Sequence, residues 1–549
     1  MEKKKGILIK NGTLVSKEYD SSRKDVLIEG GKIDGIRDRI KEKTGWHVID
    51  AENKIVSPGF LSIHSHNDFY LPLKEHPQLL KSILFQGVTT SVGGNCGISN
   101  YPIYTDHIKN IESYQGFLHY READYRWTTL EEYLDHISGN IVVNYIPLAG
   151  HGTMRVICNG FEKELGAESA ASLRKMLANC MDQGCFGMSS GLMYMPGTFS
   201  TTEELIDLCK ILNKYKAAVY TSHLRGYSDT FLESVNEAIE IGRETGVRVQ
   251  CSHLGPFGIN YGPQIDKALD LLHEANRQGV EISYDSLAYC GGSTTIMALI
   301  PPWAYENGLE LFLENIKDDG FYGKVISYIE SYIPKWPSWE GTGWTDNFVR
   351  CLGWDNLYVL GAINKDFIGK NFIRIGKERG VDKREALREV LIEEKGSAVM
   401  YMAGVGSCID DSDDMTYFDR MIEDPLCTYT IDAIFSSSGQ TMPYAYGTFP
   451  RIINRYVKNK GTITIKEAVE RFTSKAAEIF KVKDRGYLKT GAFADIVIFD
   501  LENMRDYPDI FAQNPGLSTG VEYLLINGKV VIENRNFNGV LAGEIIKNS

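Results

Sequence analysis

Residues 218–255 read AVYTSHLRGYSDTFLESVNEAIEIGRETGVRVQCSHLG and contain two short apolar runs, each of which leads into a histidine. Between the two runs, apolar residues recur at the spacing of one helix face, namely Val235, Ala238, Ile239 and Gly242. This helical pattern ends near Gly246. A strand, a helix and a second strand in this order are typical of a parallel βαβ unit.

Similar runs occur along most of the chain, and eight candidate strands can be recognised. They cover residues 60–66, 88–96, 144–152, 185–192, 218–225, 248–255, 280–289 and 430–439. Helical patterns lie between them; in TTEELIDLCKILNKYK (201–216) the leucines fall on one face and Thr202 can cap the start. Eight strands with intervening helices predict an α/β fold, a (β/α)8 TIM-like barrel over residues 58–484.

The two ends of the chain follow a different pattern, with short β-rich runs and turn dipeptides such as Asn11-Gly12 and Asn527-Gly528. We therefore expect residues 1–57 and 485–549 to form one small β-sandwich domain. Residues 293–346 concentrate Pro, Gly and Trp and interrupt the βα rhythm. This stretch predicts a lid-like insertion after strand seven, on the side of the barrel where loops build the site.

Composition narrows the possible partners. The formal net charge is −13, from 72 acidic and 59 basic residues without long blocks of one sign, which disfavours nucleic acid and anionic membranes and favours a small-molecule substrate. No apolar run is long enough to span a bilayer, and the N-terminal run breaks at Lys10 and Asn11. Ten scattered cysteines predict reduced thiols in a cytoplasmic protein. The sequence does not indicate the oligomeric state.

Candidate metal ligands recur where the predicted strands end. They are His64, His66, Cys96, His223 and His253. One such residue alone is more often a packed side chain than a ligand. Four of only 11 histidines at strand ends, however, form a pattern that chance rarely gives. Imidazole and thiolate together favour Zn²⁺, which predicts hydrolysis of an amide, a cyclic amide or an ester.

At these residues the sequence resembles the N-acyl-D-amino-acid deacylases, or D-aminoacylases, of the amidohydrolase superfamily. The likeness covers nearly the whole chain, and its motifs are SPGFLSIHSHND (57–68), GVTTSVGGNCGIS (87–99), GCFGMSSGLMYMPG (184–197), YTSHLRGYSD (220–229), CSHLG (251–255), YGTFPRIINRYV (446–457) and DRGYLKTGAFADIVIFD (484–500). GNCG is the most diagnostic, because a metal-binding cysteine on strand two distinguishes this family.

The resemblance implies a role for each matching position. Cys96, His223 and His253 correspond to the ligands of a tightly bound Zn²⁺. His64 and His66 correspond to ligands of a second, weaker metal position. Positions that contact substrate in the family are occupied here by Tyr194, Arg225 and Ser293.

The chain also departs from the family pattern. Ser438 stands where the family has the aspartate that serves as metal ligand and general base, and a hydroxyl cannot accept a proton as a carboxylate does. Gly255 stands where the family has lysine. Two further family segments read Leu287-Ala288-Tyr289 and Met442-Pro443-Tyr444 here. Several of the lost groups are suited to binding a substrate carboxylate.

Two hypotheses follow from these departures. The first is a zinc-dependent amide hydrolase with altered specificity, which includes cyclic amides and lactones as substrates. The second is a catalytically weak homologue that binds a small molecule. Candidate carboxylates to replace the missing base are Asp432, Asp285 and the acidic run Asp410, Asp411, Asp413 and Asp414, which is more simply a solvated segment.

Overall fold

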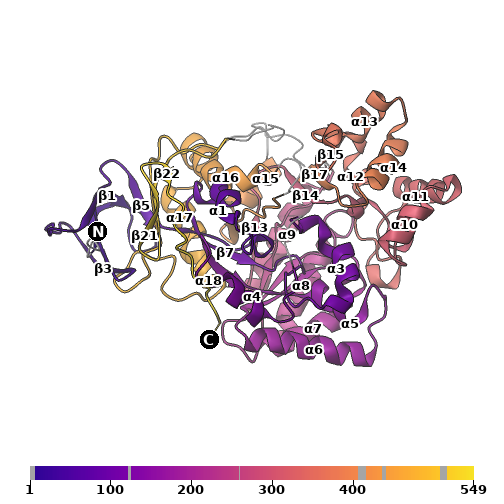
Figure 1. Ribbon diagram of the computed structural model, residues 1–549, viewed down its shortest axis with the longest axis horizontal. Coiled ribbons are helices and arrows are strands. Elements are labelled where there is room, and N and C mark those ends of the chain that lie inside the picture. Colours follow the sequence, from indigo (N-terminus) through magenta and orange to yellow (C-terminus); the bar gives the residue numbers. More distant parts are fainter. Residues whose placement is uncertain are drawn as a thin grey trace.

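A parallel barrel forms the centre of the molecule (Figure 1). The computed structural model describes residues 6–120, 125–258, 260–405, 416–435, 441–506 and 516–548. The barrel strands are β6 (Phe60–Ser62), β7 (Val88–Gly93), β8 (Asn144–Pro147) continued by β9 (Ala149–Gly150), β10 (Gly187–Gly191), β11 (Val219–His223), β12 (Arg248–Cys251), β13 (Ile282–Ser286) and β18 (Cys427–Tyr429). Strands β6 to β8 and β9 to β18 pair in parallel in that order. The predicted (β/α)8 fold is confirmed.

Helices between the strands follow the predicted periodicity. The main ones are α4 (Leu130–Ile137), α5 (His151–Asn159), α6 (Ala167–Asp182), α7 (Thr202–Leu212), α8 (Phe231–Thr245), α9 (Pro263–Arg277), α15 (Thr416–Glu423), α16 (Tyr444–Ile452), α17 (Ile465–Phe472) and α18 (Ser474–Ile479). Helix α8 ends at Gly246, whose φ of 70° closes the helix in the left-handed conformation. The cap of α7 is Thr201, whose side chain accepts from the Glu204 amide, and not Thr202.

The eighth strand is shorter and earlier than predicted. Strand β18 ends at Tyr429, whereas the sequence pattern placed the strand at 430–439. After Tyr429 the chain turns toward the first strand: the Thr430 hydroxyl and the Asp432 amide both donate to the His64 carbonyl, at 2.7 and 3.1 Å. These bonds join the segment after β18 to the segment after β6, and so close the barrel between its last and first strands.

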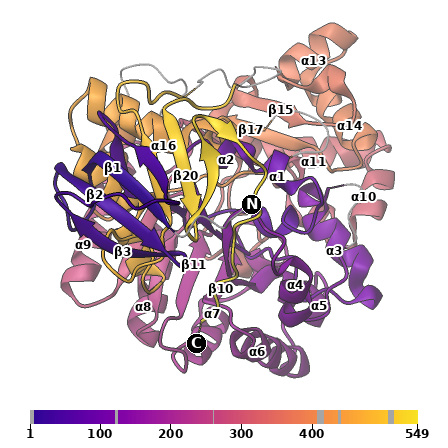
Figure 2. The ribbon, with the colours of Figure 1, turned by 60° about the vertical axis from the view of Figure 1, so that its left-hand side comes forward.

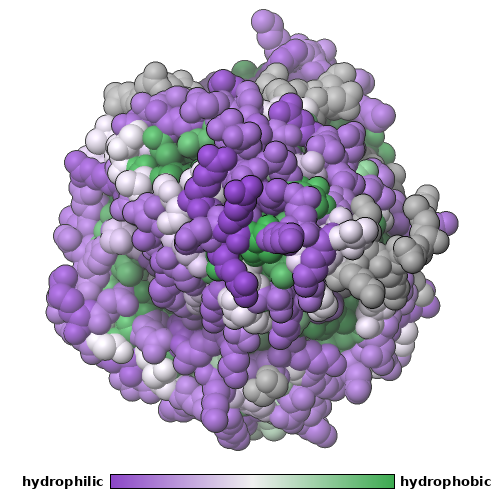
Figure 3. Space-filling view, turned by 90° about the vertical axis from the view of Figure 1, so that its left-hand side faces the viewer, coloured by the Kyte–Doolittle hydropathy of each residue, from purple (hydrophilic) through white to green (hydrophobic). Residues whose placement is uncertain are grey.

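Both ends of the chain contribute to one nine-stranded sheet, in which β22-β21-β20-β19-β5-β1-β2-β3 are neighbours and β4 pairs with β1. The bounds are β1 (Ile7–Leu14), β2 (Ser22–Glu29), β3 (Lys32–Arg37), β4 (His47–Asp50), β5 (Ile55–Pro58), β19 (Ile496–Phe499), β20 (Val521–Ile526), β21 (Lys529–Glu533) and β22 (Asn536–Phe537). Figure 2 shows β1 to β3 beside β20. This end of the molecule is mostly hydrophilic on its surface, with small separate apolar patches (Figure 3).

The insertion after strand seven is longer than the predicted 293–346, since it fills the chain between β13 and β18. It has its own antiparallel sheet of β14 (Gly291–Thr295), β17 (Val399–Ala403), β15 (Leu357–Gly361) and β16 (Lys370–Asn371). Its helices are α10 (Leu309–Asn315), α11 (Asp319–Ser331), α12 (Phe348–Leu352), α13 (Phe372–Arg379) and α14 (Lys383–Glu393), at the end of the molecule opposite the terminal sheet (Figure 1).

Two sequence expectations concern the environment of the chain. Among the described residues, no helix combines the length and apolar character that crossing a membrane requires. Eight cysteines are free thiols, as expected, but Cys290 is disulfide-bonded, so the expectation of reduced thiols is wrong at this position.

Candidate metal centre

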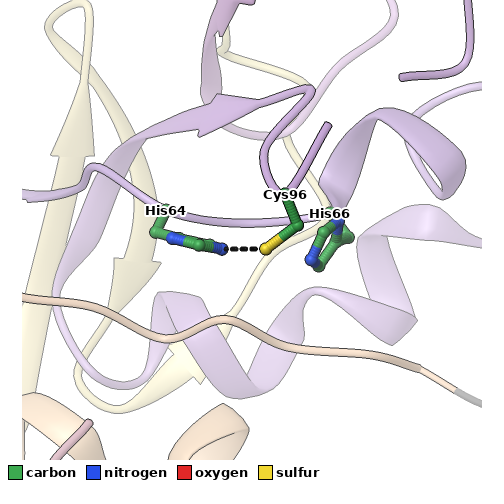
Figure 4. Close-up of side chains that lie close together, drawn as sticks. All are labelled: His64, His66 and Cys96. Carbon is green, nitrogen blue, oxygen red and sulfur yellow. Dashed lines mark hydrogen bonds between the residues drawn. The ribbon is translucent and has the colours of Figure 1, made fainter. Parts of the chain in front are cut away.

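The barrel brings the five predicted ligands together with a sixth group, Asp432. His64 and His66 follow β6, and Cys96 follows β7 (Figure 4). His223 is the last residue of β11, and His253 lies two residues beyond β12. Because all strands are parallel, their carboxyl ends open on one side of the barrel, and the residues that follow them meet there.

Short distances join these side chains. Cys96 Sγ lies 3.2 Å from His64 Nε2 and 3.6 Å from His253 Nε2. The Asp432 carboxylate lies 3.3 Å from Nε2 of both His64 and His66. Three sets of ligand atoms are close enough to hold a cation: His64, His66 and Cys96; Cys96, His223 and His253; and His64, His253 and Asp432.

Three of these residues have left-handed backbone conformations, with φ of 54° at Cys96, 34° at His253 and 42° at Asp432. Residues other than glycine rarely adopt this backbone conformation, and the strain costs about 1–3 kcal/mol at each position. In the loop of Cys96, a Cβ at Gly97 would lie only 2.5 Å from the Gly191 amide nitrogen, so the loop requires glycine there. The fold holds these turns where they direct a thiol, an imidazole and a carboxylate to one point.

The electrostatics of the cluster favour anionic donors. Burial opposes ionisation of Cys96 and Asp432, but nearby histidines outweigh it and hold both pKa values well below their usual range. Burial also opposes protonation of His66, yet Asp432 and Cys96 raise its pKa to about 9. Burial and the neighbouring His253 lower the pKa of His223 to about 4. The Cys96 thiolate, the Asp432 carboxylate and the neutral imidazole of His223 are the forms in which such groups bind metal.

Neighbouring groups orient His253. The Tyr227 hydroxyl lies 3.1 Å from His253 Nδ1, which leaves Nε2 directed at the cluster. The Asp285 carboxylate accepts from the His253 backbone amide at 2.8 Å and lies 3.8 Å from His64 Nδ1. Asp285 therefore helps to orient the ligand residues His64 and His253, as groups that contact metal ligands commonly do.

The unpaired ring nitrogens of His223 indicate that these residues fit a bound cation. Both ring nitrogens of His223 are buried without a hydrogen-bond partner among the residues that the structure describes. An unpaired buried polar atom is costly, at about 1–3 kcal/mol. A cation bound by Cys96, His223 and His253 would satisfy one of these two nitrogens and is the simplest explanation of the arrangement.

A narrow inner cavity of about 40 Å³ adjoins the cluster, and two of the three predicted substrate contacts line it. Tyr194 packs over His223 with ring centroids 4.8 Å apart, and its hydroxyl lies 2.9 Å from the Thr294 hydroxyl. The Ser293 hydroxyl lies 2.5 Å from that of Tyr444. An outer chamber of about 420 Å³ shares Tyr194, Met193 and Phe117 with the inner cavity.

The third predicted substrate contact, Arg225, is not placed at this cavity. Its side chain is fully buried, pairs with Glu237 at 2.7 Å, and donates to the carbonyls of Thr198 and Ser200. The guanidinium also packs on Trp339, 4.4 Å from the ring centroid. Because protein groups already satisfy this cation, the structure gives Arg225 a role in holding the barrel and the insertion together.

We expect Arg225→Met to destabilise the protein without changing KM. The substitution leaves Glu237 buried and unpaired, which lowers the free energy of unfolding by about 3–5 kcal/mol. Denaturant unfolding measures the loss, and adding Glu237→Gln to the same chain should recover part of it. A large rise in KM with unchanged stability would instead support the substrate contact.

Sequence reasoning included Asp432 only as one of several substitute carboxylates. Ser438 and the acidic run 410–414 lie outside the described residues, so their predicted roles are untested. The signal that could have singled out Asp432 is its place in the sequence, three residues beyond the short run that ends at Tyr429. It was not singled out because the strand was expected to continue to 439.

Comparisons with known proteins agree with the fold and with the family resemblance. The amidohydrolase family pattern matches residues 436–532. N-acyl-D-aspartate deacylase of Alcaligenes xylosoxydans xylosoxydans is 26% identical, with coverage of 98% of this chain and 94% of the relative. D-aminoacylase of the same organism is also 26% identical, with 98% and 97% coverage.

Solved structures show the same architecture. N-acyl-D-glutamate deacylase from Bordetella bronchiseptica, complexed with zinc and a phosphonate inhibitor, superposes with a TM-score of 0.80 at 24% identity, covering 99% of this chain and 100% of that one. A D-aminoacylase structure gives 0.78 at 23% identity, with 99% coverage of both chains.

The barrel, the terminal sheet and the ligand cluster define an amidohydrolase of the metal-dependent class. Within that class, the resemblance predicted from the sequence motifs is confirmed, since the chain is similar to N-acyl-D-amino-acid deacylases over nearly its whole length.

Proposed function

We propose that this protein hydrolyses an amide C–N bond of a small molecule with the help of bound Zn²⁺. The observation that carries the proposal is the convergence of four imidazoles, one thiol and one carboxylate from five strand ends on one buried point. The similarity to deacylases over 98% of the chain supports the same reaction class.

Cys96, His223 and His253 would hold the tight Zn²⁺, since their ligand atoms lie close together and His223 has no other partner among the described residues. His64 and His66, with Cys96 between them, would form a second and weaker position. When bound, Zn²⁺ lowers the pKa of water to roughly 7 and polarises a carbonyl.

Asp432 is our proposed proton acceptor. Its carboxylate lies 3.3 Å from two ligand imidazoles, lines the inner cavity, and has a depressed pKa that keeps it ionised, the form that a proton acceptor requires. A proton taken from water by Asp432 can then pass to the leaving nitrogen. Asp432 would thus do what the family resemblance assigned to the position of Ser438.

Tyr194 and Ser293 would orient the substrate. Both line the inner cavity, and both hydroxyls already lie within hydrogen-bond distance of a second hydroxyl, Thr294 or Tyr444. Because one hydrogen bond fixes each hydroxyl, its remaining donor or acceptor position points in a defined direction. Such groups suit a neutral carbonyl or amide N–H.

The alternative, a catalytically weak homologue, rests on Ser438 in place of the general-base aspartate. The buried Asp432 carboxylate weakens this alternative because it can supply the missing base. The variant Ser438→Asp separates the two hypotheses. A large gain in hydrolysis of N-acyl-D-amino acids would support a decayed site, whereas loss of the native activity would support a repurposed one. Cyclic amides and lactones belong in the same substrate panel.

Metal removal is the first test. Protein treated with chelator should lose turnover of the amide panel, and activity should return as Zn²⁺ is added back. Saturation at one equivalent would identify the tight site as sufficient, while a further change at the second equivalent would reveal the weaker position. Chelator-resistant turnover, or protein that binds no zinc, would contradict the proposal.

A further inference from the structure

We propose that the substrate is an uncharged amide that carries a bulky apolar or aromatic group and no carboxylate next to the scissile bond. This inference rests on the proposed function and names the substrate class of the same site. It comes from the linings of the inner cavity and the outer chamber.

Among the residues that the structure describes, the inner cavity offers a substrate carboxylate no lysine or arginine partner. None of its described lining residues is lysine or arginine. Residues 406–415 and 436–440, which the structure does not describe, contain neither residue in their sequence. Away from the cluster the walls are mainly apolar, with Leu254, Phe257, Leu287, Phe348, Met402 and Val405. Burying a carboxylate without a lysine or arginine to pair with it costs far more than burying a neutral group.

Two arginines on the surrounding elements already have protein partners, and packing leaves no room for a cation at position 255. Arg225 is paired with Glu237, and Arg451 pairs with Asp506 at 3.2 Å and donates to the Ala288 carbonyl. A longer side chain at Gly255 would meet Val405, whose Cγ1 would lie 2.8 Å from the added Cβ. The space beside His253 is therefore filled by apolar side chains.

The outer chamber has the size and surface for a bulky group. Its volume is about 420 Å³, against about 40 Å³ for the inner cavity. Several aromatic side chains line it, among them Phe117, Tyr125, Phe161, Tyr194, Tyr305 and Trp344. Among the described residues, the arginine and lysine that line it, Arg126 and Lys395, are exposed to solvent. A large apolar group is stabilised here, while a small uncharged group fits beside the ligands.

The reaction balances with water alone. The amide R–CO–NH–R′ loses its C–N bond, the carbonyl carbon gains the oxygen of water, and the two hydrogens end on the acid and the amine. The products are R–COOH and H₂N–R′, and neither an oxidant nor a reductant is required.

Three acetamides test the inference on the zinc-loaded full chain. They are N-(2-phenylethyl)acetamide, N-acetyl-D-phenylalaninamide and N-acetyl-D-phenylalanine, which carry hydrogen, a neutral carboxamide or a carboxylate on the same carbon. We expect kcat/KM for both neutral amides to exceed that for the acid by at least about 100-fold. Equal or preferred turnover of the acid would overturn the inference and leave amide hydrolysis standing.

Binding separates failure of the inference from failure of the proposed function. Calorimetry with zinc-free protein should give tighter binding of the two neutral amides than of the acid. If zinc-loaded protein cleaves none of the amides, cyclic amides or lactones but still prefers neutral ligands, the proposed function fails and the pocket preference holds. If the acid binds as tightly as the neutral amides, the preference fails.

Val405→Lys provides a gain-of-charge test, with Val405→Met as a control of similar length. We expect Val405→Lys to raise the acid-to-amide ratio of kcat/KM by roughly tenfold or more, because it gives the carboxylate a partner. Val405→Met should leave this ratio unchanged. Zinc content and thermal midpoints verify that both variants are folded; an unchanged ratio in a folded Val405→Lys variant counts against the inference.

Discussion

Asp432→Asn is expected to lower kcat by about 10³-fold, within the roughly 10²- to 10⁴-fold contribution of a positioned base. An amide has nearly the shape of the carboxylate but cannot accept the proton, and it removes the negative charge beside His64 and His66. Zinc bound by Cys96, His223 and His253 should be retained, because Asp432 is not one of these three. Steady-state kinetics and metal analysis of the same preparation measure both effects.

Asp424→Asn is the matched control, since Asp424 precedes the same strand, β18, and pairs with His273 at 2.7 Å, outside the ligand cluster. We expect this variant to keep most of the activity. Ser438→Ala adds a second comparison. If it abolished turnover while Asp432→Asn left turnover intact, the position assigned by the family resemblance would be the base and our assignment would be wrong.

Cys96→Ser should have the largest effect on metal binding. The thiolate belongs to two of the three possible ligand sets, and Zn²⁺ binds thiolate far better than a neutral hydroxyl. We expect zinc affinity to fall by more than about 100-fold, and turnover without added zinc to fall with it. Competition with a chromogenic chelator gives the affinity.

Cys209→Ser is the control, because Cys209 is also fully buried but lies in α7. It should cost some stability and leave the zinc stoichiometry intact. If Cys96→Ser bound zinc as tightly as the unchanged protein, the thiolate would not be a ligand, and the cluster would have to be reinterpreted around its histidines.

The sequence was most informative where local pattern and site chemistry coincide. Short apolar runs that end in His223 or near Cys96 and His253 predicted both a strand and a ligand, and the structure places those side chains together. In a parallel barrel, position at a strand end is enough to predict proximity, because all these ends open on one side. The histidines could thus be grouped without any long-range information.

Other features depend on tertiary contacts that local patterns do not encode. The turn after Tyr429 is stabilised by bonds to the His64 carbonyl, 366 residues from Thr430 in sequence, so the end of β18 was misplaced and Asp432 was not singled out. Arg225 has the same chemistry as a carboxylate-binding residue, and only the buried Glu237 and Trp339 reveal its structural use. The insertion was underestimated because its later helices resemble those of the barrel.

The sheet shared by both chain ends also constrains the order of biosynthesis. Strand β5 pairs with β19, which emerges from the ribosome about 440 residues later. At about 5–20 residues per second, one edge of β5 waits roughly 20–90 s for its partner. An unpaired strand edge readily pairs with other chains. We expect chains that stop before β19 to aggregate even when the barrel segment is complete, so newly made protein depends on protection until translation is nearly finished.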